Sequence, residues 1–179
     1  MKLIILDRDG VINQDSAAFV KTPDEWLPLP GSLQAIARLN RAGYRVVVAS
    51  NQSGVARGLI SMASLNAIHS KMRRELSNVG ASLDAIFVCP HGPDEACQCR
   101  KPLPGMFHDI ARRFDVSLQG VPAVGDSLRD LQACAQAGCA PWLVMTGNGS
   151  KTVTQQGIPP NTRSATDLAA VVDILLSDK

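Results

Sequence analysis

Two carboxylates stand directly behind an apolar segment near the start of the chain, in the run Asp7-Arg8-Asp9-Gly10. The preceding residues, 3–6, are continuously apolar, which is typical of a strand covered on both faces. Because residues two apart in an extended segment point the same way, Asp7 and Asp9 can face one ligand. Parallel sheets bind ligands beyond the carboxyl ends of their strands, so the pair stands where an active site would lie. An ordinary polar turn would explain the same four residues.

Three further polar clusters follow apolar segments along the chain. These clusters are Ser50-Asn51-Gln52-Ser53-Gly54, Arg100-Lys101-Pro102 and Gly125-Asp126-Ser127. With the first cluster, they supply carboxylates, a hydroxyl, amide donors and fixed positive charge. Phosphoryl transfer needs this combination: a nucleophile, donors and cations for the phosphate oxygens, and acidic ligands for Mg²⁺. Loop polarity explains each cluster alone, but it does not explain why all four follow strands.

Strand-like and helix-like patterns alternate between these clusters. Strands are expected at residues 3–6, 44–49, 85–88, 121–124 and 142–145. Apolar residues three or four apart predict helices within 33–39, 65–76, 106–114, 128–137 and 166–176, and Gly43, Gly80 and Gly138 end three of them. This alternation predicts one α/β domain over residues 1–179, with a Rossmann-like, doubly wound, mostly parallel sheet. Residues 146–160, rich in Gly, Thr, Gln and Pro, are expected to form a surface loop.

Composition excludes several classes of partner. The 179 residues are 45% hydrophobic and 19% charged, as in a globular protein, and the net charge of +2 provides no basis for nucleic-acid binding. No apolar stretch approaches the roughly 20 residues of a membrane span, and Asp7 interrupts the N-terminal apolar run, so no secretory signal is expected. We expect a cytoplasmic monomer that acts on a small molecule.

A second constellation, Cys89-Pro90-His91 followed by Cys97-Gln98-Cys99, resembles a zinc loop. Three thiols and one imidazole within eleven residues make a complete tetrahedral ligand set, and closed Cys₃His sites are typically structural. The expected zinc ligands are Cys89, His91, Cys97 and Cys99. The loop 89–99 ends immediately before Arg100 and Lys101, so zinc would hold these two cations over the phosphate site.

The order of the clusters resembles the haloacid dehalogenase superfamily, specifically its phosphatases with an aspartate nucleophile. This resemblance implies that Asp7 attacks phosphorus and that Asp9 acts as general acid and then general base. It also implies that Mg²⁺ is held by the Asp7 side chain, the Asp9 main-chain carbonyl and the Asp126 side chain. Ser50 and Lys101 would hold the phosphoryl oxygens. The short intervals between clusters leave no room for a cap domain.

Two groups of phosphatases in this superfamily carry a similar zinc loop. The runs 50–58 and 99–102 resemble the group that acts on heptose 1,7-bisphosphate, a precursor of the lipopolysaccharide core, more than the group that acts on histidinol phosphate. The resemblance implies a substrate site formed by Asp15, Asn51, Gln52, Ser53, Arg100 and Ser127.

Three functions remain open at this point. The first is removal of the 7-phosphate of the sugar bisphosphate, and the second is hydrolysis of histidinol phosphate, whose positive charge Asp15, Asp94 and Glu95 would favour. The third is a non-catalytic phosphate-binding or zinc-stabilised interaction module. For Asp130, a place beside the metal ligands and a helix-capping role are equally compatible with the sequence.

Overall fold

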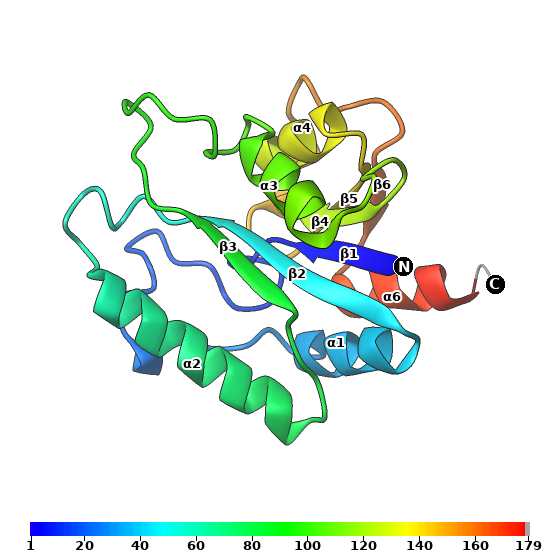
Figure 1. Ribbon diagram of the computed structural model, residues 1–179, viewed down its shortest axis with the longest axis horizontal. Coiled ribbons are helices and arrows are strands. Elements are labelled where there is room, and N and C mark those ends of the chain that lie inside the picture. The colour runs from blue at the N-terminus through cyan, green and yellow to red at the C-terminus, as the bar shows by residue number, and fades with distance from the viewer. Residues whose placement is uncertain (178–179) are drawn as a thin grey trace.

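A parallel sheet of six strands, in the order β3-β2-β1-β4-β5-β6, forms the centre of the computed structural model, which describes residues 1–177 (Figure 1). The strands are β1 (Lys2–Leu6), β2 (Tyr44–Asn51), β3 (Ala85–Cys89), β4 (Pro122–Gly125), β5 (Ala140–Val144) and β6 (Arg163–Ala165). All five neighbouring pairs are parallel. The prediction of a doubly wound α/β fold is confirmed.

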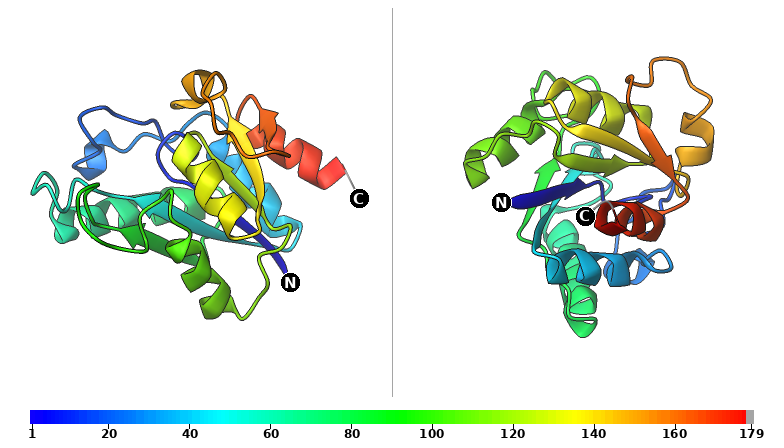
Figure 2. Two further views of the ribbon diagram at one scale, coloured as in Figure 1. Left: turned by 90° about the horizontal axis from the view of Figure 1, so that it is seen from above. Right: turned by 90° about the vertical axis from the view of Figure 1, so that its right-hand side faces the viewer.

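Helices cover both faces of this sheet, giving three layers (Figures 1 and 2). The helices α1 (Ser32–Arg41), α2 (Met62–Asn78) and α6 (Leu168–Ser177) pack on one face, and α3 (Gly105–Phe114) and α4 (Leu128–Gln136) on the other. A 3₁₀ turn, η1 (Pro23–Glu25), and a short helix, α5 (Gly149–Thr152), complete the described elements. Among the described helices, none combines the length and the apolar character that crossing a bilayer requires.

The central strand β1 contributes to both cores, which explains why its residues 3–6 are all apolar. Ile4 and Leu6 pack in the core beneath α1, α2 and α6, whereas Leu3 and Ile5 pack in the core beneath α3 and α4. Alternate side chains of a strand point to opposite faces, so a strand buried on both faces needs apolar residues at every position.

The strand order reverses at β1, which lies between β2 and β4. The main-chain N–H of Asp7, the first residue after β1, donates to the Val124 carbonyl of β4 at 2.9 Å. A reversal of this kind opens a crevice at the carboxyl edge of the sheet, because the chain connections leave it in opposite directions. The polar clusters that follow β1, β2 and β4 therefore meet at this edge.

Two elements differ from the sequence-based expectation. Beyond β5, residues Arg163–Ala165 form β6. This strand has only three residues and no apolar run, so the sequence pattern does not predict it. The stretch 146–160, expected as a surface loop, contains α5, whose Thr152 is buried and donates its hydroxyl to the Asp126 main-chain carbonyl at 2.8 Å. Part of that stretch is thus packed beside the polar clusters.

Candidate active site

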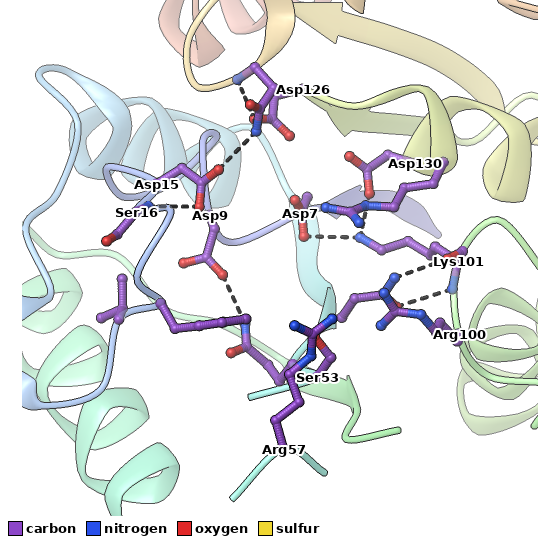
Figure 3. A pocket seen from close by; sticks show the side chains of 16 residues that line it. Asp7, Asp9, Asp15, Ser16, Ser53, Arg57, Arg100, Lys101, Asp126 and Asp130 are labelled. Atoms are coloured by element: carbon purple, nitrogen blue, oxygen red, sulfur yellow. Dashed lines mark hydrogen bonds and ion pairs between the residues drawn. The ribbon is translucent and has the colours of Figure 1, made fainter. Parts of the chain in front are cut away.

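The polar clusters surround one pocket of about 260 Å³ at the carboxyl edge of the sheet (Figure 3). Its lining consists of Asp7, Asp9, Asp15, Ser16, Phe19, Val20, Asn51, Gln52, Ser53, Arg57, Arg100, Lys101, Asp126, Arg129, Asp130 and Asn148. Residues that follow β1 and β4, the end of β2, the loop before α3 and the start of α4 are therefore brought together, as the sequence predicts.

Lys101 is the buried cation of this site. Its side chain is 2% exposed, and Nζ lies 2.9 Å from an Asp7 carboxylate oxygen, 2.6 Å from one of Asp130 and 2.7 Å from the Ala49 carbonyl oxygen. Burial disfavours the charged amine, but Asp130 and Asp7 outweigh it and raise the pKa of Lys101 above its usual value. These contacts thus favour the charged ammonium form, which contacts both carboxylates.

Asn51, the last residue of β2, fixes the main chain of Lys101. Its side-chain amide donates to the Lys101 carbonyl at 3.0 Å and accepts from the Lys101 N–H at 3.1 Å. Fifty residues separate the two in the chain. The reciprocal pair anchors the lysine to the sheet edge, so its side chain enters the pocket from a fixed position.

Three carboxylates crowd together beside the lysine. One oxygen from each of Asp7, Asp126 and Asp130 lies within 4.8 Å of the others. Burial and the neighbouring Asp130 raise the pKa of Asp7 well above its usual value, and the same two causes raise the pKa of Asp126 to about 7. Carboxylate oxygens in such a group are the ligands that Mg²⁺ prefers, and a divalent cation would relieve their mutual repulsion.

Two glycines form a close backbone contact around Asp126. Gly10 has φ of +81°, and a Cβ built there would lie 2.2 Å from an Asp126 carboxylate oxygen. The same construction at Gly147 gives 2.1 Å. Only glycine fits these two positions, because a side chain there would collide with the Asp126 carboxylate. Asp126 therefore explains why a glycine stands at position 10, directly after Asp9.

The Asp9 carboxylate is held separately from the Asp7 group. It accepts from Arg8 Nη2 at 2.8 Å and 3.0 Å, from Asn13 Nδ2 at 2.9 Å and from Gln52 Nε2 at 2.8 Å. Burial opposes ionisation, but Arg8 and these hydrogen bonds outweigh it and lower the pKa of Asp9. Figure 3 shows Asp7 directed toward Lys101 and the Asp9 carboxylate directed away from it.

Two serines predicted for the site lie outside the pocket lining. Ser50 is 1% exposed, and its hydroxyl oxygen accepts from Gln52 Nε2 at 2.8 Å. Ser127 caps α4: its N–H and hydroxyl both donate to Asp130, and its side chain accepts from the Asp130 N–H in return. Substrate contact by Ser127 stays a prediction, whereas capping is what its geometry shows. Asp130 both caps the helix and pairs with Lys101.

Three arginines line the outer side of the pocket. Arg100 donates to the His91 carbonyl at 3.2 Å, and Arg57 lies over the Phe19 ring at 5.8 Å. Partial burial lowers the pKa of Arg100, and the charges of Arg129 and Arg57 lower it further. Within residues 1–177, no carboxylate lies at ion-pair distance from any of the three guanidinium groups. Unpaired cations converging on a pocket form an anion-binding surface.

The Cys/His cluster lies beside this surface. The facing ligand atoms of Cys89, His91, Cys97 and Cys99 lie within 4.8 Å of one another. His91 Nδ1 is 3.3 Å from Cys99 Sγ and 3.6 Å from Cys89 Sγ. Ligands of a tetrahedral zinc ion at roughly 2.0–2.3 Å from the metal have comparable mutual spacing. The four side chains therefore fit a metal ion.

Some residues of the site were not predicted from the sequence. Asn148 donates its N–H to an Asp126 carboxylate oxygen at 2.7 Å and its side-chain amide to Asp15 at 2.8 Å. It follows β5 in the stretch expected as a surface loop, and no local pattern marks it. No local pattern marks Asn13 either, although it stands four residues after Asp9, and the turn between them brings its amide to the Asp9 carboxylate. Arg129, two residues after Ser127, could have been suspected from its position in the first turn of a helix at the sheet edge.

Comparison with known proteins gives a consistent result. The pattern of the haloacid dehalogenase-like hydrolases matches residues 2–138. A D-glycero-beta-D-manno-heptose-1,7-bisphosphate 7-phosphatase of Bordetella bronchiseptica is 71% identical over 178 residues, covering 99% of both chains. One from Pseudomonas putida is 51% identical and covers 98% of this chain and 100% of its own. A solved D,D-heptose 1,7-bisphosphate phosphatase from B. bronchiseptica, complexed with magnesium and phosphate, matches with a TM-score of 0.99 at 70% identity over 100% of both chains.

The capping geometry of Ser127 leads to a prediction. Ser127→Ala should lower the free energy of unfolding by about 1 kcal/mol, because an N-cap hydrogen bond is lost. The KM for substrate should stay within about twofold, since the Ser127 hydroxyl already donates to Asp130. Urea denaturation and steady-state kinetics measure the two effects. A large rise in KM with unchanged stability would instead support substrate contact.

Proposed function

The chain belongs to the haloacid dehalogenase-like hydrolases, and we propose that it removes the 7-phosphate of D-glycero-β-D-manno-heptose 1,7-bisphosphate in a Mg²⁺-dependent reaction. The observation that carries this proposal is a buried Lys101–Asp7 ion pair that shares one pocket with Arg57, Arg100 and Arg129. We assign the whole of residues 1–179 to a single phosphatase domain with a metal-binding loop at 89–99.

Asp7 is the proposed nucleophile. Its carboxylate oxygen attacks phosphorus as the bond from phosphorus to the sugar oxygen breaks, which forms an aspartyl-phosphate. Asp9 is ionised in the free enzyme, so it must take up a proton when the anionic substrate binds beside it; it then gives this proton to the departing sugar oxygen. A water molecule then attacks the phosphoryl group, Asp9 accepts the proton of that water, and inorganic phosphate leaves with Asp7 regenerated. The hydrogen bonds to Asp9 orient its carboxylate for both proton transfers.

Lys101 and Ser50 are the proposed partners of the transferring phosphoryl oxygens. The Lys101 ammonium already contacts Asp7, so it lies next to the atom that forms the new bond. The Ser50 hydroxyl oxygen accepts from Gln52, which leaves the hydroxyl proton of Ser50 for donation to a phosphoryl oxygen.

Asp7 and Asp126, with the main-chain carbonyl of Asp9, are the proposed ligands of Mg²⁺. The close carboxylate oxygens of Asp7, Asp126 and Asp130 support this assignment. The chemistry that Mg²⁺ supplies when bound is neutralisation of the charge that a nucleophilic carboxylate and a phosphate place side by side. Asp130 stays with Lys101 and thereby keeps the lysine directed at Asp7.

The second phosphate of the substrate is assigned to Arg57, Arg100 and Arg129. A sugar bisphosphate carries an anion at the end remote from the reacting phosphate, and guanidinium groups bind phosphate through paired N–H donors. Asn51, Gln52, Ser53 and Asp15 are the proposed contacts of the sugar hydroxyls between the two phosphates.

Histidinol phosphate fits this pocket less well. Its remote end is cationic, so it would meet three unpaired arginines. Of the acids considered for it, Asp94 and Glu95 line a separate hollow beside Arg57, and only Asp15 lines the main pocket. A non-catalytic binding module is disfavoured because both proposed catalytic carboxylates are present.

Zinc is the metal that we propose for the Cys/His cluster. Arg100 donates to the carbonyl of His91, so a metal ion that fixes the His91 ring also steadies the main chain that holds Arg100. The proposed role of zinc is therefore structural: it holds the wall of the pocket that recognises the remote phosphate.

Asp7→Asn tests the mechanism. It should lower Mg²⁺-dependent release of inorganic phosphate by at least about 10³-fold, because an amide cannot act as the nucleophile. Circular dichroism should show an unchanged fold. Asp115→Asn, at an exposed position after α3 with φ of +50°, is the matched control and should keep full activity. Undiminished turnover in Asp7→Asn would contradict the aspartyl-phosphate mechanism.

Arg129→Met tests the assignment of the remote phosphate. It should raise KM for the heptose bisphosphate by about tenfold or more, because charge-assisted hydrogen bonds to phosphate are lost. Turnover of histidinol phosphate, which lacks that phosphate, should not fall. Arg113→Met, at an exposed position of α3, is the matched control and should have the wild-type KM.

A comparison of the two substrates tests the proposed substrate itself. The wild-type enzyme, assayed under identical Mg²⁺, should have a higher kcat/KM for the bisphosphate than for histidinol phosphate. A wild-type preference for histidinol phosphate would overturn the proposed substrate.

Cys97→Ser tests the zinc loop. Elemental analysis should find about one zinc per wild-type chain, and this variant should lose most of it, with a lower unfolding temperature and a higher KM. Cys139→Ala, a buried cysteine outside the cluster, should keep its zinc. Freshly purified wild-type protein without zinc would count against this assignment.

A further inference from the structure

Arg8 stands between the two proposed catalytic carboxylates in the chain, yet its side chain does not line the pocket. It is 1% exposed, which is unusual for an arginine. Its Nε lies 3.1 Å from one Asp9 carboxylate oxygen, and its Nη2 lies 2.8 Å and 3.0 Å from the two oxygens. Two sides of the guanidinium group are therefore committed to Asp9.

The remaining side of Arg8 meets His69 on α2. Arg8 Nη1 lies 3.4 Å from His69 Nε2, although 61 residues separate the two in the chain. A guanidinium group carries only donors, so Nε2 must accept and the imidazole must be neutral, with its proton on Nδ1. Burial and the charge of Arg8 lower the pKa of His69 to about 4, against the opposing effect of Asp9, which agrees with this tautomer.

We propose that His69 is a positioning residue of the reaction, which acts through Arg8 to fix the orientation of the Asp9 carboxylate. The inference rests on the proposed role of Asp9 as general acid and base. A residue of α2 thereby takes part in the chemistry at the carboxyl edge of the sheet.

The geometry supports this chain of contacts in two steps. A carboxylate rotates readily about its last bond unless donors hold both oxygens, and the fork of Arg8 holds both. The orientation of the Arg8 guanidinium group is fixed in turn by its remaining nitrogen, Nη1, which donates to Nε2 of His69. Without it, a nearly fully buried N–H group would lack this partner, so the guanidinium group would turn toward another acceptor and carry Asp9 with it.

Asn13 and Gln52 complete the support but cannot replace it. Each donates a single hydrogen bond to Asp9, and Gln52 lines the pocket, where substrate can compete for its amide. The Arg8–His69 contact is shielded from the pocket and is attached to α2, a 17-residue helix packed on the sheet. A rigid element behind the catalytic side chain is what precise proton transfer requires.

His69→Leu tests this role, because leucine keeps an apolar volume but accepts no hydrogen bond. It should lower kcat by about tenfold with KM within about twofold, since Asp9 acts on the departing oxygen and the water and not on substrate binding. His69→Gln should restore kcat to near the wild-type value, because its amide oxygen can accept from Arg8. His108→Leu, at an exposed histidine of α3, is the matched control and should have no effect.

The outcomes separate this inference from the proposed function. Asp9→Asn, assayed in parallel, should be almost inactive; full activity there would refute the role of Asp9 itself. If Asp9→Asn is inactive, then wild-type kcat in His69→Leu overturns the inference, and so does a His69→Gln variant that is impaired to the same extent. A rise in KM alone would also overturn it. Should His69→Leu fail to fold, His69→Met against His69→Gln provides the same comparison.

Discussion

The site depends on one buried ammonium group, that of Lys101, held between Asp7 and Asp130. Removing a charged amine from water costs several kcal/mol, so it remains buried only where opposite charges and hydrogen bonds compensate fully. Two carboxylates and the Ala49 carbonyl do this. The same contact keeps the carboxylate of Asp7 near a cation, so the interaction that stabilises the lysine also prepares the proposed nucleophile.

Other features of the structure follow from keeping this lysine in place. Its main chain is bound by Asn51 at the end of β2, and Asp130 is held to it by the cap of α4. The Cys/His loop begins at the last residue of β3 and returns the chain to the position of Lys101. The ends of β1 and β2 and the start of α4 therefore converge on Lys101, and the reversal of strand order at β1 makes this possible.

The inner and outer parts of the pocket carry charges of opposite sign and therefore favour different ligands. Inside, closely spaced carboxylates favour a divalent cation; outside, three guanidinium groups favour an anion. A substrate with a phosphate at each end matches both parts. No separate cap domain is needed for such discrimination, because the loops at the carboxyl edge of the sheet supply the charges themselves.

Much of this could be predicted from local patterns in the sequence. The apolar run before Asp7 predicts a strand buried on both faces, the glycines after three helices predict where they end, and the spacing of Cys89, His91, Cys97 and Cys99 predicts a metal loop. Periodicity and turn chemistry act over a few residues, so the sequence alone determined strands β1 to β5, helices α1 to α4 and α6, their order and which side chains follow those strands, but not β6 or α5. Only the tertiary structure decided which distant groups come together: Asn148 contacts Asp126, His69 contacts Arg8, and Arg129 and Arg100 line the same pocket. Those contacts depend on how helices and loops pack over the finished sheet, and no pattern local to either partner records that packing.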